Sequence, residues 1–280
     1  MIHKSNILHL TLFLLTIAST FFVGLGDGLS GAFWYSGGLM SILLAHEMGH
    51  YLMARKYGVP VSLPFFIPMP LPPFGTMGAV IKMKGMMPNR KALFDVGAAG
   101  PFAGLALIIP AILFGLKMSP VVEKTADHPD WITLGDSLLF TLLSKIAVGT
   151  IPEGSDILLH PLAFAGWVGL LVTAINLLPA GQLDGGHVLY AIMGRKSRFA
   201  ALFFYAAFVI IFLFFYAGWG LLIVLLAIFR NHPPTWNDAE SIGRERRILG
   251  GLTLLLFVLS FTPVPFGFAK GLIPLILEGF

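Results

Sequence analysis

The chain has 280 residues, of which 56% are hydrophobic and 11% are charged, and its mean hydropathy is +0.85. A soluble globular domain carries about 25% charged residues, so this chain has too little polar surface to cover itself in water, which excludes an ordinary soluble domain. The formal net charge of +4 is small, and the absence of cysteine excludes disulfides and thiolate metal sites.

Long runs without charge predict an all-α polytopic membrane protein, because a helix needs roughly 20 apolar residues to cross the hydrocarbon core. The fifth of these runs has 31 residues, which is too long for one span, and Gly218-Trp219-Gly220 interrupts it. We therefore expect two short spans there and about seven transmembrane segments in all. The runs are 5–26, 28–46, 96–116, 157–183, 199–229 and 248–269.

The basic residues are distributed unevenly between the connecting segments. Lys and Arg follow the second, fourth and fifth runs, whereas the loop at 117–156 carries three Lys against six acidic residues. Segments rich in Lys and Arg stay on the cytoplasmic side of a membrane. We therefore expect the loop at 117–156 to be extracytoplasmic. The runs within 199–269 are expected to be accessory C-terminal spans.

Residues 59–90 differ from the rest of the chain, because seven prolines prevent a continuous helix there. The segment from Gly78 to Gly85 alternates apolar and basic residues over its second half, as a strand does. Non-helical backbone at membrane depth survives only where it is shielded or lines a wet cavity. We expect a small membrane-associated β element, with a plain cytosolic loop as the alternative.

The second run ends on an H-E-x-x-H motif, His46-Glu47-Met48-Gly49-His50. Residues at i and i+4 share one helical face, so both imidazoles can reach one metal ion while Glu47 flanks the open position. Zinc with three protein ligands and one water is the catalytic arrangement, and Glu47 would take the proton from that water as it attacks a carbonyl. A histidine pair that only caps a helix end is the structural alternative.

A third ligand is expected where the fourth run ends. Pro179 and Gly181 break the helix, so Asp184 can turn inward. His187, three residues later, is an alternative ligand, and an interfacial acid that caps the following glycines is the structural alternative. The positions of the motifs relative to the basic segments place both at similar depth on the same side.

These residues resemble a known family. H-E-x-x-H on one span, followed by N-x-x-P-x-x-x-L-D-G at the end of a later span, resembles the site-2 protease family of intramembrane zinc metalloproteases. Every fixed position is present in His46–His50 and Asn176–Gly185. Four further segments resemble the bacterial and plastid branch, here without PDZ or CBS domains: 74–78, 89–95, 100–104 and 261–266.

The resemblance implies one zinc ion per chain, held by His46, His50 and Asp184, with Glu47 as general base. It implies a three-helix catalytic core at about 33–190, within what the sequence leads us to expect as a single domain, 1–280. It also implies that Asn176 helps to bind substrate or to steady the oxyanion. The strand would pair with an unwound substrate as an added strand, and its residues are Ala79, Val80, Ile81, Lys82 and Met83.

The implied function is hydrolysis of peptide bonds in single-span membrane proteins. We expect a multi-pass protein of a prokaryotic plasma membrane, with the lipid bilayer and not nucleic acid as its partner, and with the active site toward the cytoplasm. The oligomeric state is not indicated. A membrane transporter or channel with an intramembrane metal site is the alternative, and a catalytically inactive scaffold is a third hypothesis that the intact Glu47 disfavours.

Two further groups of residues receive a plainer interpretation. Gly97, Gly100 and Gly104 permit close helix approach and are interpreted as packing residues. His232 has no partner at ligand spacing, so no function is expected for it.

Overall fold

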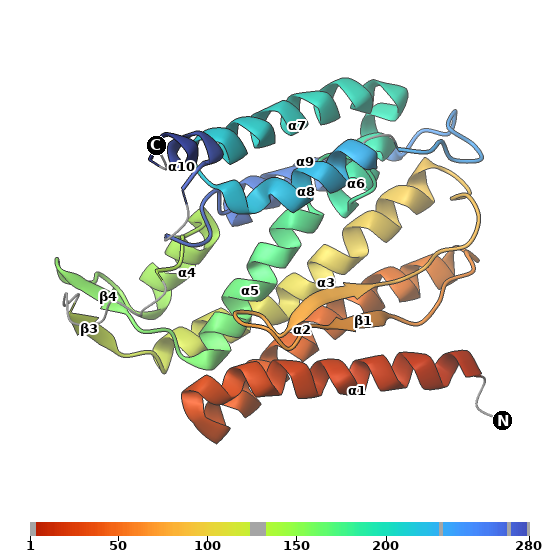
Figure 1. The fold of residues 1–280 in the computed structure, drawn as a ribbon. Coiled ribbons are helices and arrows are strands. Elements are labelled where there is room, and N and C mark those ends of the chain that lie inside the picture. The colour runs from red at the N-terminus through yellow and green to blue at the C-terminus, as the bar shows by residue number, and fades with distance from the viewer. Residues whose placement is uncertain (1–3, 124–132, 230–231, 268–269, 279–280) are drawn as a thin grey trace. The chain divides into compact units, whose positions relative to one another are not determined.

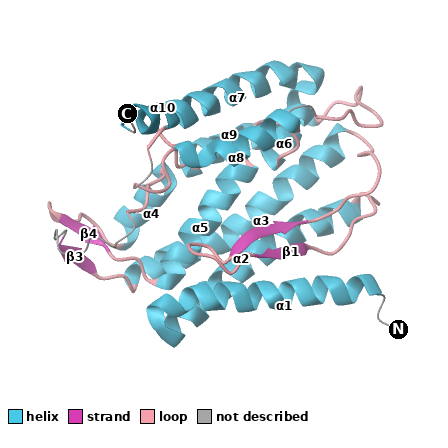
Figure 2. Cartoon of the chain, viewed as in Figure 1, coloured by secondary structure: helices cyan, strands magenta, loops and turns pink. Residues whose placement is uncertain are grey.

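The computed structural model describes residues 4–123, 133–229, 232–267 and 270–278. Helices dominate this part of the chain, and two pairs of short strands complete it (Figure 1, Figure 2). The helices are α1 (Lys4–Gly24), α2 (Gly28–Lys56), α3 (Arg90–Lys117), α4 (Leu138–Ala147), α5 (Pro161–Asn176), α6 (Asp184–Met193), α7 (Ser197–Phe214), α8 (Gly220–Ile228), α9 (Gly243–Ser260) and α10 (Leu272–Glu278). The strands are β1 (Phe65–Pro68), β2 (Thr76–Val80), β3 (Val121–Glu123) and β4 (Ser155–Ile157).

The chain divides into two compact units, each described here by itself. The first comprises Met1–Gly85, Ala99–Lys124 and Leu139–Thr173, and the second comprises Met86–Ala98, Thr125–Leu138 and Ala174–Phe280. The division falls inside α3 and near the end of α5, so both helices contribute to both units. Part of the loop expected at 117–156, namely 124–132, lies outside the described residues.

In the first unit, α1 packs along α2 after a reversal at a short 3-10 helix, Leu25–Asp27. Gly28 follows it with φ of +78°, a left-handed conformation that glycine adopts without steric cost. The two helices share a buried hydrogen bond of 2.7 Å between the hydroxyls of Thr20 and Ser36. Short polar side chains of this kind link apolar helices where water is absent.

The hairpin of β1 and β2 lies against these two helices. The strands pair antiparallel, with Phe66 opposite Ala79. The Ser19 hydroxyl donates to the Gly75 carbonyl at 2.6 Å, and the Tyr35 hydroxyl donates to the Phe74 carbonyl at 2.7 Å. Side chains of α1 and α2 therefore satisfy backbone groups of the hairpin turn, as irregular backbone near a membrane requires.

The β element lies slightly earlier in the chain than the alternation predicted. β2 ends at Val80, and Met83 forms only an isolated bridge with Val61. The Lys82 carbonyl accepts from the Ser62 amide at 3.0 Å, so the backbone beyond Val80 continues beside the segment that precedes β1.

In the second unit, the first turns of α3 are tied to segments distant in sequence. Arg90 donates to the carbonyls of Ala191 and Ile192 at 2.8 and 2.9 Å, which satisfies carbonyls at the end of α6. Asp95 accepts two hydrogen bonds from Arg246 of α9, at 2.8 and 2.7 Å. Parallel bonds of this kind combine charge with fixed geometry, so α3, α6 and α9 form one framework.

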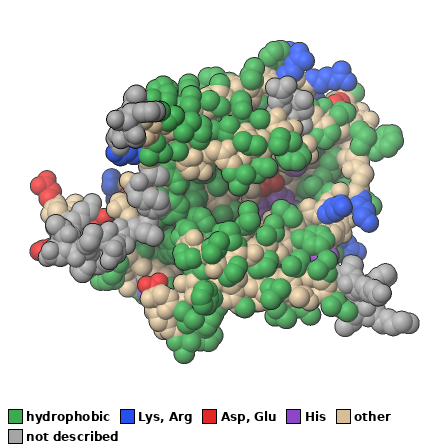
Figure 3. All heavy atoms as spheres, viewed as in Figure 1, with side chains coloured by type: hydrophobic (Ala, Val, Ile, Leu, Met, Phe, Trp, Pro, Cys, Tyr) green, Lys and Arg blue, Asp and Glu red, His purple; other side chains and the backbone are tan. Residues whose placement is uncertain are grey.

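Three helical stretches of the described residues are long and apolar enough to cross a membrane: 6–56, Arg90–Lys117 and Asp184–Phe214. Hydrophobic side chains cover most of the face shown in Figure 3. The seven expected spans are not confirmed. The 16 residues of α5 extend only about 24 Å at 1.5 Å per residue. The fourth apolar run, 157–183, enters this helix only at Pro161, and a turn follows Asn176. The run at 199–229 is divided by the 3-10 helix Ala217–Trp219.

Candidate metal centre

In the first unit, α2 carries the H-E-x-x-H motif as one turn of continuous helix. His46, Glu47 and His50 are 4%, 6% and 6% exposed. The Nε2 atoms of the two histidines lie 3.1 Å apart. The i, i+4 spacing thus brings both ring nitrogens to one point, as the motif predicts.

This spacing fits a shared zinc ion. Two nitrogens at 2.0–2.1 Å from a tetrahedral zinc are separated by about 3.3 Å, which is close to the observed 3.1 Å. Ionisable groups buried in an apolar helix carry a free-energy cost and mark functional positions. A histidine pair that merely caps a helix end is excluded, because both residues precede the end of α2 at Lys56 by more than one turn.

Two glycines of α3 lie against these histidines. A Cβ atom at Gly100 would overlap the His50 ring, and one at Gly104 would lie 3.4 Å from the Cβ and Nδ1 atoms of His46. Gly49 of α2 faces Ala99 in the same way, with its added Cβ 2.5 Å from the Ala99 carbonyl oxygen. The packing interpretation of the glycines is therefore incomplete, because Gly100 and Gly104 approach the side chains of His46 and His50 themselves.

The sequence contains one part of the signal for this contact between the glycines and the histidines, namely the spacing. Gly100 and Gly104 are four residues apart, as His46 and His50 are, so one face of each helix repeats at the same spacing. The sequence does not indicate that these two faces meet.

In the second unit, the segment after α5 places Asp184 at a helix start. α5 ends at Asn176, and Leu183 is extended before α6 begins at Asp184, which is half-buried. Gly181 has a φ of +61°, which permits the reversal between the helices. The predicted break at Pro179 and Gly181 is therefore observed.

The glycines after Asp184 are required by close packing. A Cβ at Gly185 would overlap the Leu177 carbonyl, and one at Gly186 would lie 2.8 Å from the Ala180 carbonyl oxygen. The D-G-G sequence thus lets the start of α6 pack directly on the backbone of the preceding turn. Gly97 of α3 also approaches α6, since its Cβ would lie 2.8 Å from the Cβ of His187.

His187 has a partner that the sequence did not indicate. Its Nδ1 atom lies 2.7 Å from Nε2 of His232, whose Nδ1 lies 2.6 Å from the Pro233 carbonyl oxygen. A carbonyl only accepts, so His232 donates through Nδ1, its neutral ring accepts at Nε2, and His187 donates. The two histidines are 45 residues apart, and no local pattern could have linked them.

His46, His50 and Asp184 supply two imidazole nitrogens and one carboxylate, a donor set that could hold a metal ion. Two histidines and one acid are among the ligand sets of catalytic zinc sites. The chemistry of the donors therefore fits zinc.

Comparison with known proteins identifies the class. The model of "Peptidase family M50" matches residues 34–216, and the chain belongs to this family. It is 36% identical over 236 residues to "Probable zinc metalloprotease EGY1, chloroplastic" of Arabidopsis thaliana, covering 81% of this chain and 42% of the relative. The rice protein of the same name (Oryza sativa subsp. japonica) is 35% identical over 81% of this chain and 40% of the relative.

A third relative is "Probable zinc metalloprotease EGY2, chloroplastic" of Arabidopsis thaliana, 33% identical over 87% of this chain and 43% of the relative. The chain therefore spans about two fifths of the length of these relatives. The resemblance to the site-2 protease family is confirmed. Zinc is the metal in the names of these relatives, and the donor set of His46, His50 and Asp184 fits it. The relatives are named as chloroplastic, so the expectation of a prokaryotic plasma membrane is not supported.

Proposed function

We propose that this chain is an intramembrane zinc metalloprotease that hydrolyses peptide bonds of single-span membrane proteins. The observation that carries the proposal is the convergence of His46 and His50 beside Glu47, all buried on an apolar helix. Membership of peptidase family M50 supplies the reaction class. In this proposal Asp184 completes the ligand set for one zinc ion per chain.

The proposed chemistry assigns a role to each side chain. Zinc supplies Lewis acidity, which lowers the pKa of water to about 7 and polarises a carbonyl. The Glu47 carboxylate accepts the proton of the attacking water and then delivers it to the leaving amine. The Asn176 amide donates to the substrate or to the oxyanion that forms during attack.

The β element supports a way of presenting the substrate. A helix has its backbone groups bonded internally, so it must unwind before a protease can reach a carbonyl. In the described sheet, β2 has β1 as its one partner strand, and an open strand edge can accept a further strand. We propose that Ala79 and Val80, with the segment Ile81–Met83, receive the unwound substrate.

The location of the active site is part of the proposal. The basic segments that follow α2 and α6 support an active site toward the cytoplasmic side, because Lys and Arg accumulate on that side of a membrane. A transporter or channel would need polar groups spread along a path through several helices. In the described residues the buried Asp, Glu, Lys, Arg and His side chains are His9, His46, Glu47 and His50, which favours a single reaction centre.

The test uses the purified full chain and a single-span model substrate. Glu47→Gln should retain zinc and lose activity by about 10²–10⁴-fold, the usual contribution of a general base. His46→Ala should lose zinc as well, whereas the exposed Glu245→Gln should behave as the unmodified protein. Normal cleavage by Glu47→Gln would overturn the proposed mechanism.

A further inference from the structure

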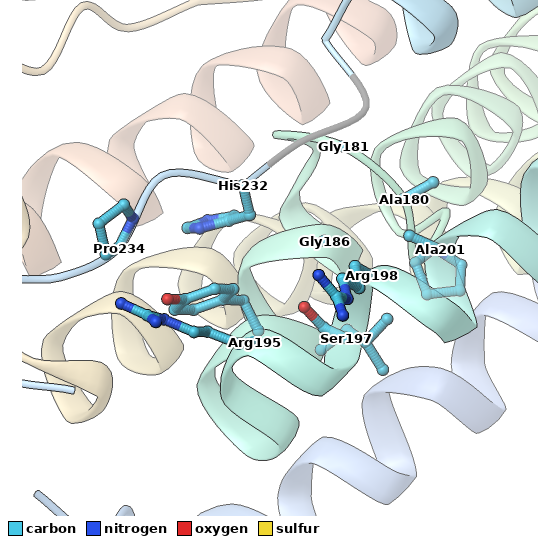
Figure 4. Close-up of a pocket in the computed structure, with 12 residues that line it drawn as sticks. Ala180, Gly181, Gly186, Arg195, Ser197, Arg198, Ala201, His232 and Pro234 are labelled. Carbon is cyan, nitrogen blue, oxygen red and sulfur yellow. The ribbon is translucent and has the colours of Figure 1, made fainter. Parts of the chain in front are cut away.

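A cavity of about 260 Å³ lies in the second unit, at the turn between α6 and α7 (Figure 4). His232 and Pro234 lie on one side of it and the start of α7 on the other. Its lining residues are Pro179, Ala180, Gly181, Gly186, Leu189, Tyr190, Arg195, Ser197, Arg198, Ala201, His232 and Pro234. The volume is slightly below the usual range for drug-sized ligands, which starts at about 300 Å³, and suits a compact polar group.

The charge of the lining is positive. Arg195 and Arg198 contribute two guanidinium groups, and the lining residues include no Asp or Glu. Neither arginine forms an ion pair with any residue that the structure describes. The guanidinium of Arg198 lies 4.7 Å from the centroid of the Phe199 ring, a contact that leaves its edge donors available.

The other polar side chains of the cavity differ in whether they are available to bind a ligand. Ser197 is buried and offers a hydroxyl. The Tyr190 hydroxyl already donates to Asp238 at 2.7 Å, and Nε2 of His232 faces His187. The available donors are therefore two arginines and one serine, a combination that recognises phosphate oxygens.

The position of the cavity indicates where such a phosphate comes from. α7 is apolar from Phe199 onward, with Phe199, Leu202 and Phe203 exposed by 62%, 60% and 69%. Arg195 and Arg198 lie four residues and one residue before Phe199, where this surface begins. Basic pockets at the ends of membrane helices are placed at the level of lipid head groups, and the exposed rings beside this pocket can contact acyl chains.

We propose that this cavity binds the phosphate of an anionic phospholipid head group from the surrounding leaflet. Arg195 and Arg198 hold the phosphate oxygens, and the Ser197 hydroxyl donates a further bond. The acyl chains lie along Phe199, Leu202 and Phe203. The lining includes Gly186, two residues after Asp184, but it includes neither Glu47 nor any proposed zinc ligand, so lipid binding can be measured separately from the proposed proteolysis.

Native mass spectrometry of the detergent-solubilised full chain can test this site, with dioctanoyl phosphatidylglycerol as the anionic probe and dioctanoyl phosphatidylcholine as the zwitterionic one. Arg195→Gln with Arg198→Gln should weaken phosphatidylglycerol binding by about tenfold or more, since hydrogen bonds to charged groups are lost. The control is Lys196→Gln, which removes one positive charge, against two in the double variant, from a side chain outside the cavity lining. It should change binding less than twofold.

Three results would overturn the proposal. One is an equal effect per charge removed in Lys196→Gln and in the double variant, which would indicate general surface charge. Another is equal affinity for the two lipids. The third is displacement of the lipid by inorganic phosphate at the same concentration, which would make free phosphate the natural ligand. Melting temperatures of all variants should match that of the unmodified chain, so loss of binding is separable from loss of fold.

Discussion

Gly100 of α3 faces the imidazole ring of His50 so closely that a Cβ atom there would overlap the ring. Supporting contacts around a metal ligand commonly change affinity by 10–100-fold when altered. A residue without a side chain therefore positions a proposed zinc ligand, and this relationship can be tested directly.

Gly100→Ala should displace the His50 ring and weaken zinc binding by about 10–100-fold, measured by competition with a chelator. The matched control is Gly104→Ala, whose Cβ would lie at an ordinary contact distance of 3.4 Å from His46. Alanine has a better helix propensity than glycine, so Gly104→Ala should retain zinc and stability. Equal zinc affinity in the two variants would show that the close approach to His50 has no role in metal binding.

The contact between His187 and His232 predicts a pH dependence. Burial lowers the pKa of His232 below its ordinary value and outweighs the Pro233 carbonyl and the Asp238 charge, which raise it. Protonated His232 would place an N–H against the donor of His187, while the Tyr190 ring stacks on it with a centroid distance of 4.4 Å. The neutral form is therefore the one that the fold favours.

This preference sets the direction in which stability changes with pH. The unfolded chain has a histidine pKa of about 6.5. The stability that the contact contributes is therefore complete above this pH, and it is lost as pH falls from there through the lower pKa of folded His232. Hydrogen exchange of residues 232–238, corrected for the intrinsic rate, should accelerate below pH of about 6.5. In His232→Asn the acceleration should disappear. The same acceleration in the variant would assign the effect to other groups.

Local patterns predicted the parts of this structure that depend on near neighbours. The four-residue spacing of His46 and His50 predicted their convergence, and Pro179 predicted the end of α5 before it. The bond from Arg90 to the Ala191 carbonyl and the pair of Asp95 with Arg246 span 101 and 151 residues. Periodicity carries no information at these separations, and it also failed to reveal that α5 covers only Pro161–Asn176 of the fourth apolar run.

The pair of Asp95 and Arg246 should contribute measurably to stability. Their side chains are 19% and 30% exposed, and the carboxylate accepts two bonds from one guanidinium. Asp95→Asn should destabilise the chain by about 1–2 kcal/mol, between the values for exposed and buried pairs, and lower its melting temperature. Arg246→Gln should do the same, and the double variant should be less destabilised than the sum of the two. Strict additivity would indicate that the two side chains act independently.

The last prediction concerns the edge of the β element. Ile81 follows β2 directly, and Val80 beside it is 52% exposed. A substrate that unwinds in hydrocarbon leaves backbone donors and acceptors unpaired, each at a cost of several kcal/mol, and an open strand edge can pair with them. Ile81→Pro removes one backbone donor and distorts this edge.

Proteolysis of a single-span substrate by Ile81→Pro should therefore fall by at least about tenfold, while zinc per chain stays normal, because the ligands of α2 and α6 are untouched. Met86→Pro is the matched control, since Met86 is exposed and lies outside β2 and the Met83 bridge. It should cleave as the unmodified chain does. If the zinc-loaded Ile81→Pro protein cleaves at the same rate as Met86→Pro, this segment is a connector and the substrate is presented elsewhere.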